Sequence, residues 1–196
     1  MKHILFISIL VVLTACSGLE NTWETKNISG LMPDLSFRLT DVATDKPVSE
    51  EDYKGNLLLL YFGYTQCPDV CSTTMIRLSN AILALGDSAK NVRLLFVSVD
   101  PKRDTIPVMK NYTHAFGEQV IGLRGGEDEL QSLTKRYRVT YGYGKPDSEG
   151  NYIVSHSSAV YVFDREGEAR LLIRSTDPLA SIEHDLIHLL KEEQNR

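Results

Sequence analysis

An unbroken run of six apolar residues, at positions 57–62, constrains the fold of this 196-residue chain more than any other stretch. A continuous apolar run that ends in a glycine is typical of a strand buried on both faces, and such strands belong to parallel sheets covered by helices. An apolar-periodic segment follows at 70–85, and a second apolar run occupies 92–99. The sequence therefore predicts a β-α-β unit with a right-handed crossover.

The remaining segments extend this unit on both sides. We expect an edge strand at 35–40, a helix at 105–116, a short strand at 120–123, a helix from 125 to about 137, a loop at 139–152, two strands at 158–163 and 169–174 joined by a tight turn, and a terminal helix that begins at Pro178. This order predicts an α/β, thioredoxin-like fold: a central mixed sheet flanked by helices, with an N-terminal β extension and an inserted helix and strand.

The first residues of the chain have the form of a signal peptide. Lys2 supplies a positive charge, positions 4–13 form an apolar run, and Leu13-Thr14-Ala15-Cys16 ends it. A run of this length is too short for an ordinary membrane span. The last four residues resemble a bacterial lipobox, which implies cleavage before Cys16, lipidation of its sulfur and a membrane tether. An ordinary signal peptide with a chance cysteine stays open as the alternative.

Three segments are therefore expected: a lipoprotein signal peptide at 1–15, a tether at 16–30 and the folded domain at 31–196. The expected location is extracytoplasmic, on the periplasmic side of a bacterial membrane, and Ser17 after Cys16 leaves both the inner and the outer membrane open. Of the three cysteines, lipidation of Cys16 would leave one pair in the domain. Outside the cytoplasm, a lone pair of cysteines is most often a disulfide or part of a metal site.

That pair, Cys67 and Cys71, lies where the first core strand gives way to the first helix. Residues four apart share a helix face with Cβ atoms about 5–6 Å apart, which suits two thiolates on one metal better than a disulfide. A Cys-Pro-x-x-Cys disulfide can nevertheless close. We also expect the helix N-terminus to ease loss of the thiol protons. Metal binding and thiol redox chemistry both remain open at this point.

His156 is the best candidate for a third ligand. It lies where a loop enters the strand predicted at 158–163, and in a thioredoxin-like sheet that segment lies beside the start of the first helix. Redox enzymes of this fold place a cis-proline there, but residues 147–177 contain no proline. His184 and His188 form an i, i+4 pair that can chelate metal, but they fall on the polar flank of the terminal helix, where a solvated pair is expected.

Together, Cys67, Cys71 and His156 would offer two sulfurs and one nitrogen. Soft thiolates favour Cu(I), and an added imidazole also accommodates Cu(II). Zinc fits the same ligand types, but a structural zinc site requires a fourth protein ligand, and none is evident in the sequence.

These motifs jointly resemble the Sco/SenC family of copper-binding proteins. The family pattern is a Cys-Pro-x-x-Cys site after an apolar strand, a later Asp-Pro-x-Arg-Asp-Thr segment and a distal histidine. Here the matching residues are Cys67-Pro-Asp-Val-Cys71, Asp100-Pro-Lys-Arg-Asp-Thr105 and His156, accompanied by Tyr61-Phe-Gly-Tyr-Thr and Lys135-Arg-Tyr-Arg-Val. The likeness spans about residues 35–190.

The resemblance implies a membrane-tethered copper metallochaperone. Members of the family bind copper and help to build the dinuclear copper centre of cytochrome c oxidase, by delivering copper or by reducing the cysteines of that centre. The implied partners are the copper-centre subunit or another cuproprotein, and an upstream copper donor. The implied ligands are Cys67, Cys71 and His156, with secondary roles for Asp100 and Arg103 in shaping the site and for Asp69 in tuning the charge of the cysteines.

Two other functions fit the same residues. One is an extracytoplasmic thiol-disulfide oxidoreductase that uses Cys67 and Cys71 as its redox pair, and the other is a redox or copper sensor. The missing cis-proline and the three-residue spacer argue against general disulfide exchange. The formal net charge is −5 and the chain has no basic run, so nucleic-acid binding is not expected.

Overall fold

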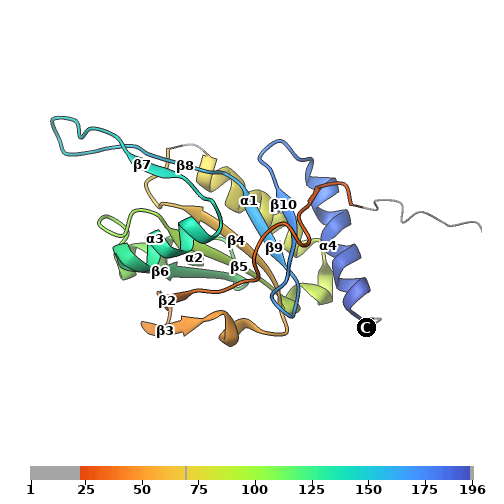
Figure 1. Ribbon diagram of the computed structural model, residues 1–196. Helices are drawn as coiled ribbons and strands as arrows, with labels where there is room; N and C mark the ends of the chain where they lie inside the picture. The colour runs from red at the N-terminus through yellow and green to blue at the C-terminus, as the bar shows by residue number, and fades with distance from the viewer. Residues whose placement is uncertain (1–22, 69, 195–196) are drawn as a thin grey trace, which may run out of the picture.

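The computed structural model describes residues 23–68 and 70–194 (Figure 1). The predicted signal peptide, the predicted lipidation site Cys16, and Asp69 lie outside the described residues. Among the described residues, the main sheet has eight strands in the order β1-β10-β9-β4-β5-β6-β2-β3. Their bounds are β1 Lys26–Asn27, β2 Arg38–Asp41, β3 Lys46–Ser49, β4 Leu57–Gly63, β5 Val92–Ser98, β6 Val120–Arg124, β9 Val160–Phe163 and β10 Ala169–Ile173.

The helices connect these strands as the sequence predicts. They are α1 Val70–Leu83, α2 Ile106–His114, α3 Glu127–Arg136 and α4 Leu179–Gln194, with 3-10 turns at Glu50–Tyr53 and Gly86–Asn91. β4, β5 and β6 run parallel, while β9 and β10 pair antiparallel and add to the free side of β4. A parallel β-α-β unit followed by an antiparallel hairpin and a last helix confirms the thioredoxin-like fold.

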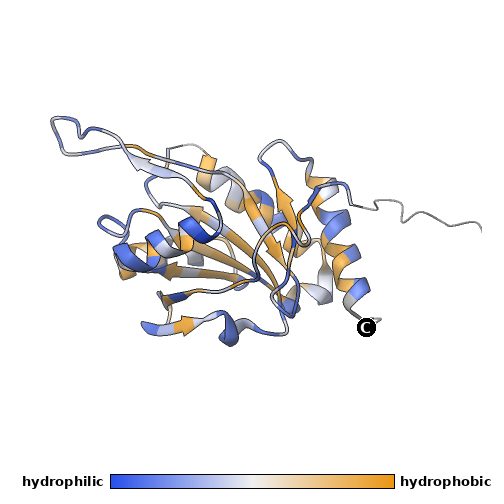
Figure 2. Cartoon of the chain, viewed as in Figure 1, coloured by the Kyte–Doolittle hydropathy of each residue, from blue (hydrophilic) through white to orange (hydrophobic). Residues whose placement is uncertain are grey.

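The core forms two layers, one on each face of the sheet. Side chains alternate along β4, so Leu57, Leu59 and Tyr61 pack with α1, α2 and α4, whereas Leu58, Leu60 and Phe62 pack with α3 and the N-terminal segment. Figure 2 shows the result, with apolar strands inside and polar residues on the outer faces of the helices. No helix in the described part of the chain combines the length and apolarity that a membrane span requires.

The structure corrects two of the predicted elements. The strand expected at the edge is β2, but it lies between β6 and β3, and β3, for which no strand was predicted, occupies the edge. Pro47 lies in β3, and proline is tolerated in an edge strand because its missing N–H faces no partner strand. The predicted loop at 139–152 contains β7 Tyr141–Tyr143, which pairs with β8 Val154–His156 as a separate two-stranded sheet.

Asp185 on α4 fastens the N-terminal segment to the domain. Its carboxylate is 1% exposed and accepts hydrogen bonds from the backbone N–H groups of Glu24 and Thr25, at 3.0 and 2.7 Å, and from the Thr25 hydroxyl at 2.7 Å. Burial opposes the ionisation of Asp185, but hydrogen bonds from Glu24, His184 and Thr25 outweigh it and hold its pKa below the ordinary value.

Asp185→Ala is expected to lower the free energy of unfolding by about 1–3 kcal/mol at pH 7, because it leaves buried donors without an acceptor. A carboxylate with a depressed pKa stabilises the fold above its unfolded pKa and loses that contribution as the pH falls through the folded pKa. The difference from wild type should therefore shrink below about pH 4, as measured by urea denaturation. Glu118→Ala, at an exposed position, should show no comparable loss.

Candidate metal centre

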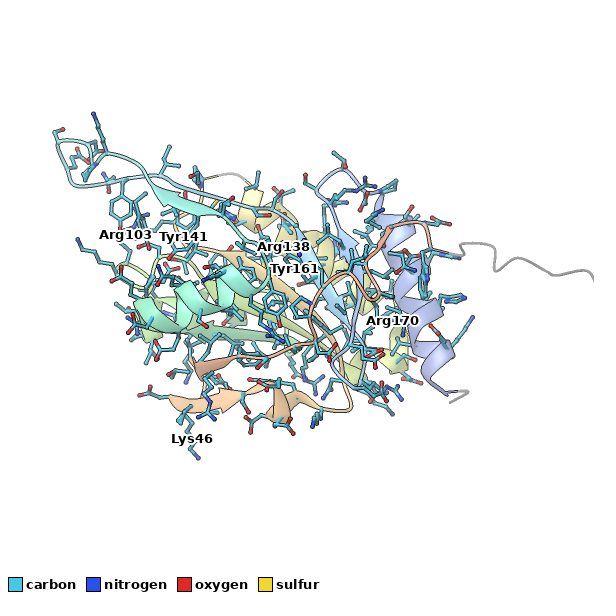
Figure 3. The ribbon with its side chains drawn as sticks, in the orientation of Figure 1. Lys46, Arg103, Arg138, Tyr141, Tyr161 and Arg170 are labelled. Carbon is cyan, nitrogen blue, oxygen red and sulfur yellow. The ribbon has the colours of Figure 1, made fainter. Side chains whose placement is uncertain are left out.

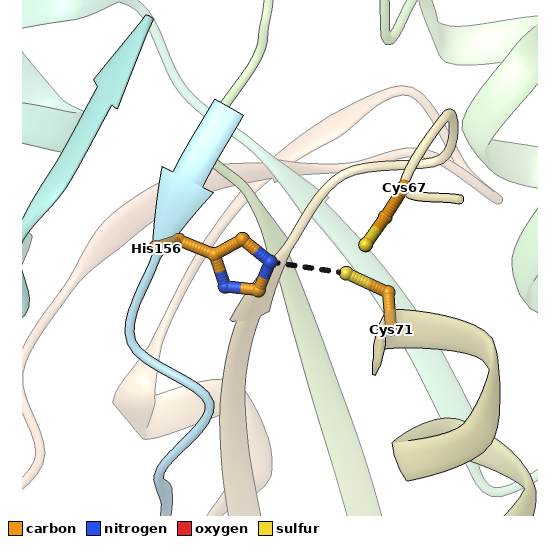
Figure 4. Close-up of side chains that lie close together, drawn as sticks. All are labelled: Cys67, Cys71 and His156. Atoms are coloured by element: carbon orange, nitrogen blue, oxygen red, sulfur yellow. Dashed lines mark hydrogen bonds between the residues drawn. The ribbon is translucent and has the colours of Figure 1, made fainter. Parts of the chain in front are cut away.

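Three donor atoms converge where β4, α1 and β8 meet (Figure 4). The Sγ atoms of Cys67 and Cys71 and a ring nitrogen of His156 all lie within 4.8 Å of one another. The Cys71 Sγ and the His156 Nε2 are 3.2 Å apart. Among the described residues, no other group of three such side chains is arranged in this way. The structure thus brings together the three residues predicted as ligands.

Local structure explains how each side chain reaches this point. β4 ends at Gly63, and Cys67 follows in a turn in which its N–H donates to the Tyr64 carbonyl at 3.3 Å. Cys71 is the second residue of α1 and points inward, while Cys67 is half-buried. His156 is the last residue of β8, whereas the sequence predicted it in a loop that enters the strand at 158–163.

The His156 ring is oriented by its second nitrogen. Its Nδ1 lies 2.9 Å from the Ser157 carbonyl oxygen, and a carbonyl can only accept, so Nδ1 carries the proton. In a neutral ring this leaves the Nε2 lone pair directed at the sulfurs, which is the arrangement typical of metal-binding histidines. The Tyr64 ring packs edge-on against His156, with centroids 5.8 Å apart.

Cys71 differs from the prediction in its acidity. We expected the helix N-terminus to favour the thiolate, but Cys71 is fully buried, and this burial raises its pKa to about 12 despite a hydrogen bond that its sulfur accepts from the Tyr64 backbone. Desolvation of the thiolate therefore outweighs the helix dipole. A thiol in this state is a poor nucleophile at neutral pH. A metal that binds here has to displace the Cys71 proton.

Alkylation of the reduced protein should reflect this difference. Iodoacetamide is expected to modify Cys67, which is partly exposed, before Cys71. The rate at Cys71 should still rise about tenfold between pH 9 and pH 10, because the thiolate fraction grows tenfold per pH unit below the pKa. Peptide mass spectrometry over a pH series measures both rates. A Cys71 rate that levels off by pH 9 would contradict the raised pKa.

Three residues of the β5–α2 turn, Asp100, Arg103 and Asp104, form a bracket between the loop that carries Cys67 and the segment that leads to His156. Asp100 is fully buried; it forms an ion pair with Arg103 and accepts a hydrogen bond from the Tyr152 hydroxyl at 2.9 Å. The Arg103 guanidinium lies 3.6 Å from the centroid of the Tyr152 ring and donates to the Tyr152 carbonyl at 2.8 Å and to Gln66 at 3.3 Å. Arg103 thus touches the cysteine loop and the strand leading to His156, and Figure 3 shows it beside the β7–β8 hairpin near Tyr141.

Asp104 forms the other arm of this bracket. Its buried carboxylate accepts hydrogen bonds from the Thr65 hydroxyl at 2.6 Å, from the Thr65 N–H at 3.1 Å and from the Ser98 hydroxyl at 2.6 Å. Thr65 lies two residues before Cys67, so Asp104 anchors the cysteine loop to the end of β5. Neither Asp104 nor Tyr152 was singled out from the sequence; Asp104 lies inside a recognised motif, but Tyr152 carries no local signal.

Asp104→Asn is expected to weaken metal binding by about tenfold, because the loss of an outer-shell anchor typically costs 10- to 100-fold in metal affinity. An amide keeps the shape but lacks the second acceptor that Thr65 and Ser98 share. A competitive copper titration measures the change, with Asp128→Asn, an exposed acid on α3, as the control. Equal affinity in both variants would show that the bracket does not position the loop.

Gly63 is a further residue that sequence reasoning missed. A Cβ atom at this position would lie 2.7 Å from the Phe96 ring and 3.1 Å from the Cys71 sulfur. Position 63 therefore requires glycine for the Cys71 side chain to pack against the end of β4. The signal was available, since a glycine within a strand often marks a close approach.

The other histidines among the described residues lie away from this centre. His114 is exposed at the end of α2. His184 is 47% exposed at its side chain, as the expected solvated pair requires. His188, in contrast, is half-buried and packs against Trp23, with ring centroids 4.6 Å apart.

Comparisons with known proteins agree with this geometry. The SCO1/SenC family profile matches residues 31–191. An SCO2-like protein of Rickettsia felis is 36% identical over 121 residues, which cover 61% of this chain and 59% of that protein. The chain spans less than two thirds of the length of this relative, and 44% of the mitochondrial SCO2 protein of Saccharomyces cerevisiae.

Two solved structures extend the likeness to three dimensions. The copper-bound structure of Bradyrhizobium japonicum ScoI has a TM-score of 0.72 and 35% identity, and the match covers 80% of this chain and 98% of that one. Yeast Sco1 with copper bound has a TM-score of 0.73 and 26% identity, over 84% of this chain and 95% of the other. With a family profile that matches most of its length and a fold shared with these structures, the chain belongs to the SCO1/SenC family.

Proposed function

We propose that this protein binds copper through Cys67, Cys71 and His156 and serves the assembly of the dinuclear copper centre of cytochrome c oxidase. The convergence of the three donor atoms within 4.8 Å carries the proposal. Metal–sulfur and metal–nitrogen bonds of about 2.0–2.3 Å leave ligand atoms up to roughly 4.6 Å apart, so this set needs little rearrangement to share one ion. The copper in the two similar solved structures supports the choice of metal.

The ligand set suits an ion that is to be passed on. Two thiolates satisfy Cu(I), and the imidazole adds the nitrogen that Cu(II) prefers. Cys67 and His156 are both partly exposed, so a partner's ligands can approach them while Cys71 remains buried. Copper is the cargo here, and the protein supplies the orientation of its ligands and an apolar wall that limits access of water.

The same two sulfurs support a second role, the reduction of a partner's disulfide. Both cysteines are reduced and close together, so they can form a Cys67–Cys71 disulfide while the partner's disulfide accepts two electrons and two protons. The raised pKa of Cys71 makes it a slow attacking thiol, and Cys67 would have to start the exchange. We therefore place copper binding first.

A titration separates the two roles. The reduced full chain is titrated with Cu(I) against a chromophoric competitor, and with Cu(II) by its thiolate charge-transfer absorption. We expect one tight copper per chain, which is lost in Cys67→Ser and in Cys71→Ser. If the wild type binds copper no better than these variants but still reduces a model disulfide, the copper-binding function is wrong and the reductase function takes its place.

We also propose that residues 1–15 are a lipoprotein signal peptide, that Cys16 carries a lipid, and that the predicted tether 16–30, up to the point where β1 (Lys26–Asn27) joins the main sheet, links the domain to a membrane on the periplasmic side. The basic start, the apolar run and the tetrapeptide ending in Cys16 support this arrangement. Radiolabelled palmitate should label the wild type but not Cys16→Ser. Equal labelling of the two proteins would rule out Cys16 as the lipid site.

A further inference from the structure

His184 and His188 lie one helical turn apart on α4, well separated in sequence from the thiols and their partner histidine. Residues four apart share a helix face, and the two rings face each other with centroids 6.4 Å apart and planes 26° apart. We propose that His184 and His188 form a second metal site, built without thiols, that takes a divalent transition ion such as Cu(II), Ni(II) or Zn(II).

Asp185 prepares His184 to act as a ligand. The His184 Nδ1 lies 3.0 Å from the Asp185 carboxylate, which can only accept, so Nδ1 carries the proton and Nε2 keeps a lone pair. The carboxylate itself cannot turn away, because the backbone of Glu24 and Thr25 holds it. Metal-binding histidines usually donate their other ring N–H to a carboxylate or carbonyl in this way.

One ring nitrogen of His188 lacks a hydrogen-bond partner among the described residues. Its Nδ1 is buried and has no hydrogen-bond partner within the part of the chain that the structure describes. Ring nitrogens in such positions normally have a partner, and a metal ion would supply one to this imidazole. The ring is held in place by its edge-on contact with Trp23.

The surroundings favour a cation. The Glu24 carboxylate lies 3.8 Å from the His184 Nδ1, and together with Asp185 it places two acids beside His184. Imidazole nitrogens bind these metals at about 2.0–2.1 Å, so the exposed His184 ring has to turn toward His188, which the Cβ spacing of an i, i+4 pair permits. Among divalent ions, Cu(II) should bind most tightly.

The chain carries its own reporter for this site. Trp23 is the single tryptophan of the sequence, and its ring centroid lies 4.6 Å from that of His188. Bound Cu(II) quenches the fluorescence of a nearby indole. The full chain with Cys16→Ser, Cys67→Ser and Cys71→Ser is titrated with copper(II) chloride alone, so that the result does not depend on the proposed thiol site.

We expect saturable quenching that His184→Ala weakens by at least about tenfold, because one of two chelating imidazoles is gone. His114→Ala removes an exposed histidine that has no histidine four residues away, and should leave the titration unchanged. Repeating the series in the cysteine-containing chain with nickel(II) chloride, which does not oxidise thiols, keeps the test valid if the serine background does not fold. The proposal is overturned by unsaturable quenching, by equal quenching in wild type and His184→Ala, or by equal losses in His184→Ala and His114→Ala.

Discussion

Replacement of His156 by alanine is expected to weaken Cu(II) binding by at least about a hundredfold, which corresponds to about 2.7 kcal/mol. The expected loss of Cu(I) affinity is far smaller. The reason lies in the ligands that remain, because two thiolates suffice for Cu(I), whereas Cu(II) favours nitrogen donors. The His156 Nε2 is the nitrogen that lies 3.2 Å from the Cys71 sulfur. Competitive titrations of both oxidation states measure the two affinities.

Two further variants make this result specific. His156→Phe keeps an aromatic ring against Tyr64 but has no nitrogen, so it should behave like His156→Ala. His114→Ala should bind both ions as the wild type does. If His156→Phe retained full Cu(II) affinity, the nitrogen ligand would have to come from another residue, and the assignment of His156 would be wrong.

Gly63→Ala is expected to reduce the stability of the protein by about 3 kcal/mol, or to preserve stability only by displacing Cys71 from the site. The added methyl group would lie 2.7 Å from the Phe96 ring and 3.1 Å from the Cys71 sulfur. Both neighbours are fully buried, so neither can move into solvent to make room. Movement of Cys71 would break its 3.2 Å contact with His156. Either route should lower copper affinity by at least tenfold.

Urea denaturation and copper titration of the same variant distinguish the two routes. Gly142→Ala is a matched control, because Gly142 also lies in a strand but a Cβ there would meet only the Ser155 hydroxyl, at an ordinary 3.4 Å. We expect the control to change stability by less than about 1 kcal/mol. A Gly63→Ala protein with wild-type stability and wild-type copper affinity would contradict this prediction. It would show that the side chains around the end of β4 can move aside to make room for a methyl group at little cost.

The parts of the fold that the sequence predicted are those with strong periodicity. β4 and β5 are long apolar runs, and α1 and α4 carry regular stripes, so their type and order could be identified from residue spacing alone. β7 and β8 were missed because each has three residues and pairs with the other outside the main sheet. A short pair of strands of this kind depends on tertiary contacts, and these produce no hydrophobic periodicity in the sequence.

The same limit applies to the site. The pairing of Cys67 and Cys71 with His156 followed from the fold, because β9 runs antiparallel to β4, so the segment that enters β9 lies beside the end of β4, where the cysteines follow. The acidity of Cys71 did not follow, since spacing locates a residue at a helix N-terminus but does not reveal how deeply it is buried. The contacts from Asp104 to Thr65 and from Arg103 to Tyr152 join residues about 40 to 50 positions apart, and no local sequence pattern predicts such contacts.

Because His156 lies on a separate hairpin, the apparent copper affinity depends on the fraction of molecules in which that hairpin is docked against the site. Among the described residues β8 pairs with β7 as its one partner strand. The ties of this hairpin to the rest of the molecule include the contacts of Tyr152 with Arg103 and Asp100, the hydrogen bond from the Val154 N–H to the Tyr64 hydroxyl, and the burial of the Val154 side chain in the core. Only molecules with the hairpin docked offer three ligands, so the apparent dissociation constant is the intrinsic one divided by the docked fraction. A partner that lifted the hairpin in nine molecules of ten would weaken three-ligand binding about tenfold without touching copper or either sulfur.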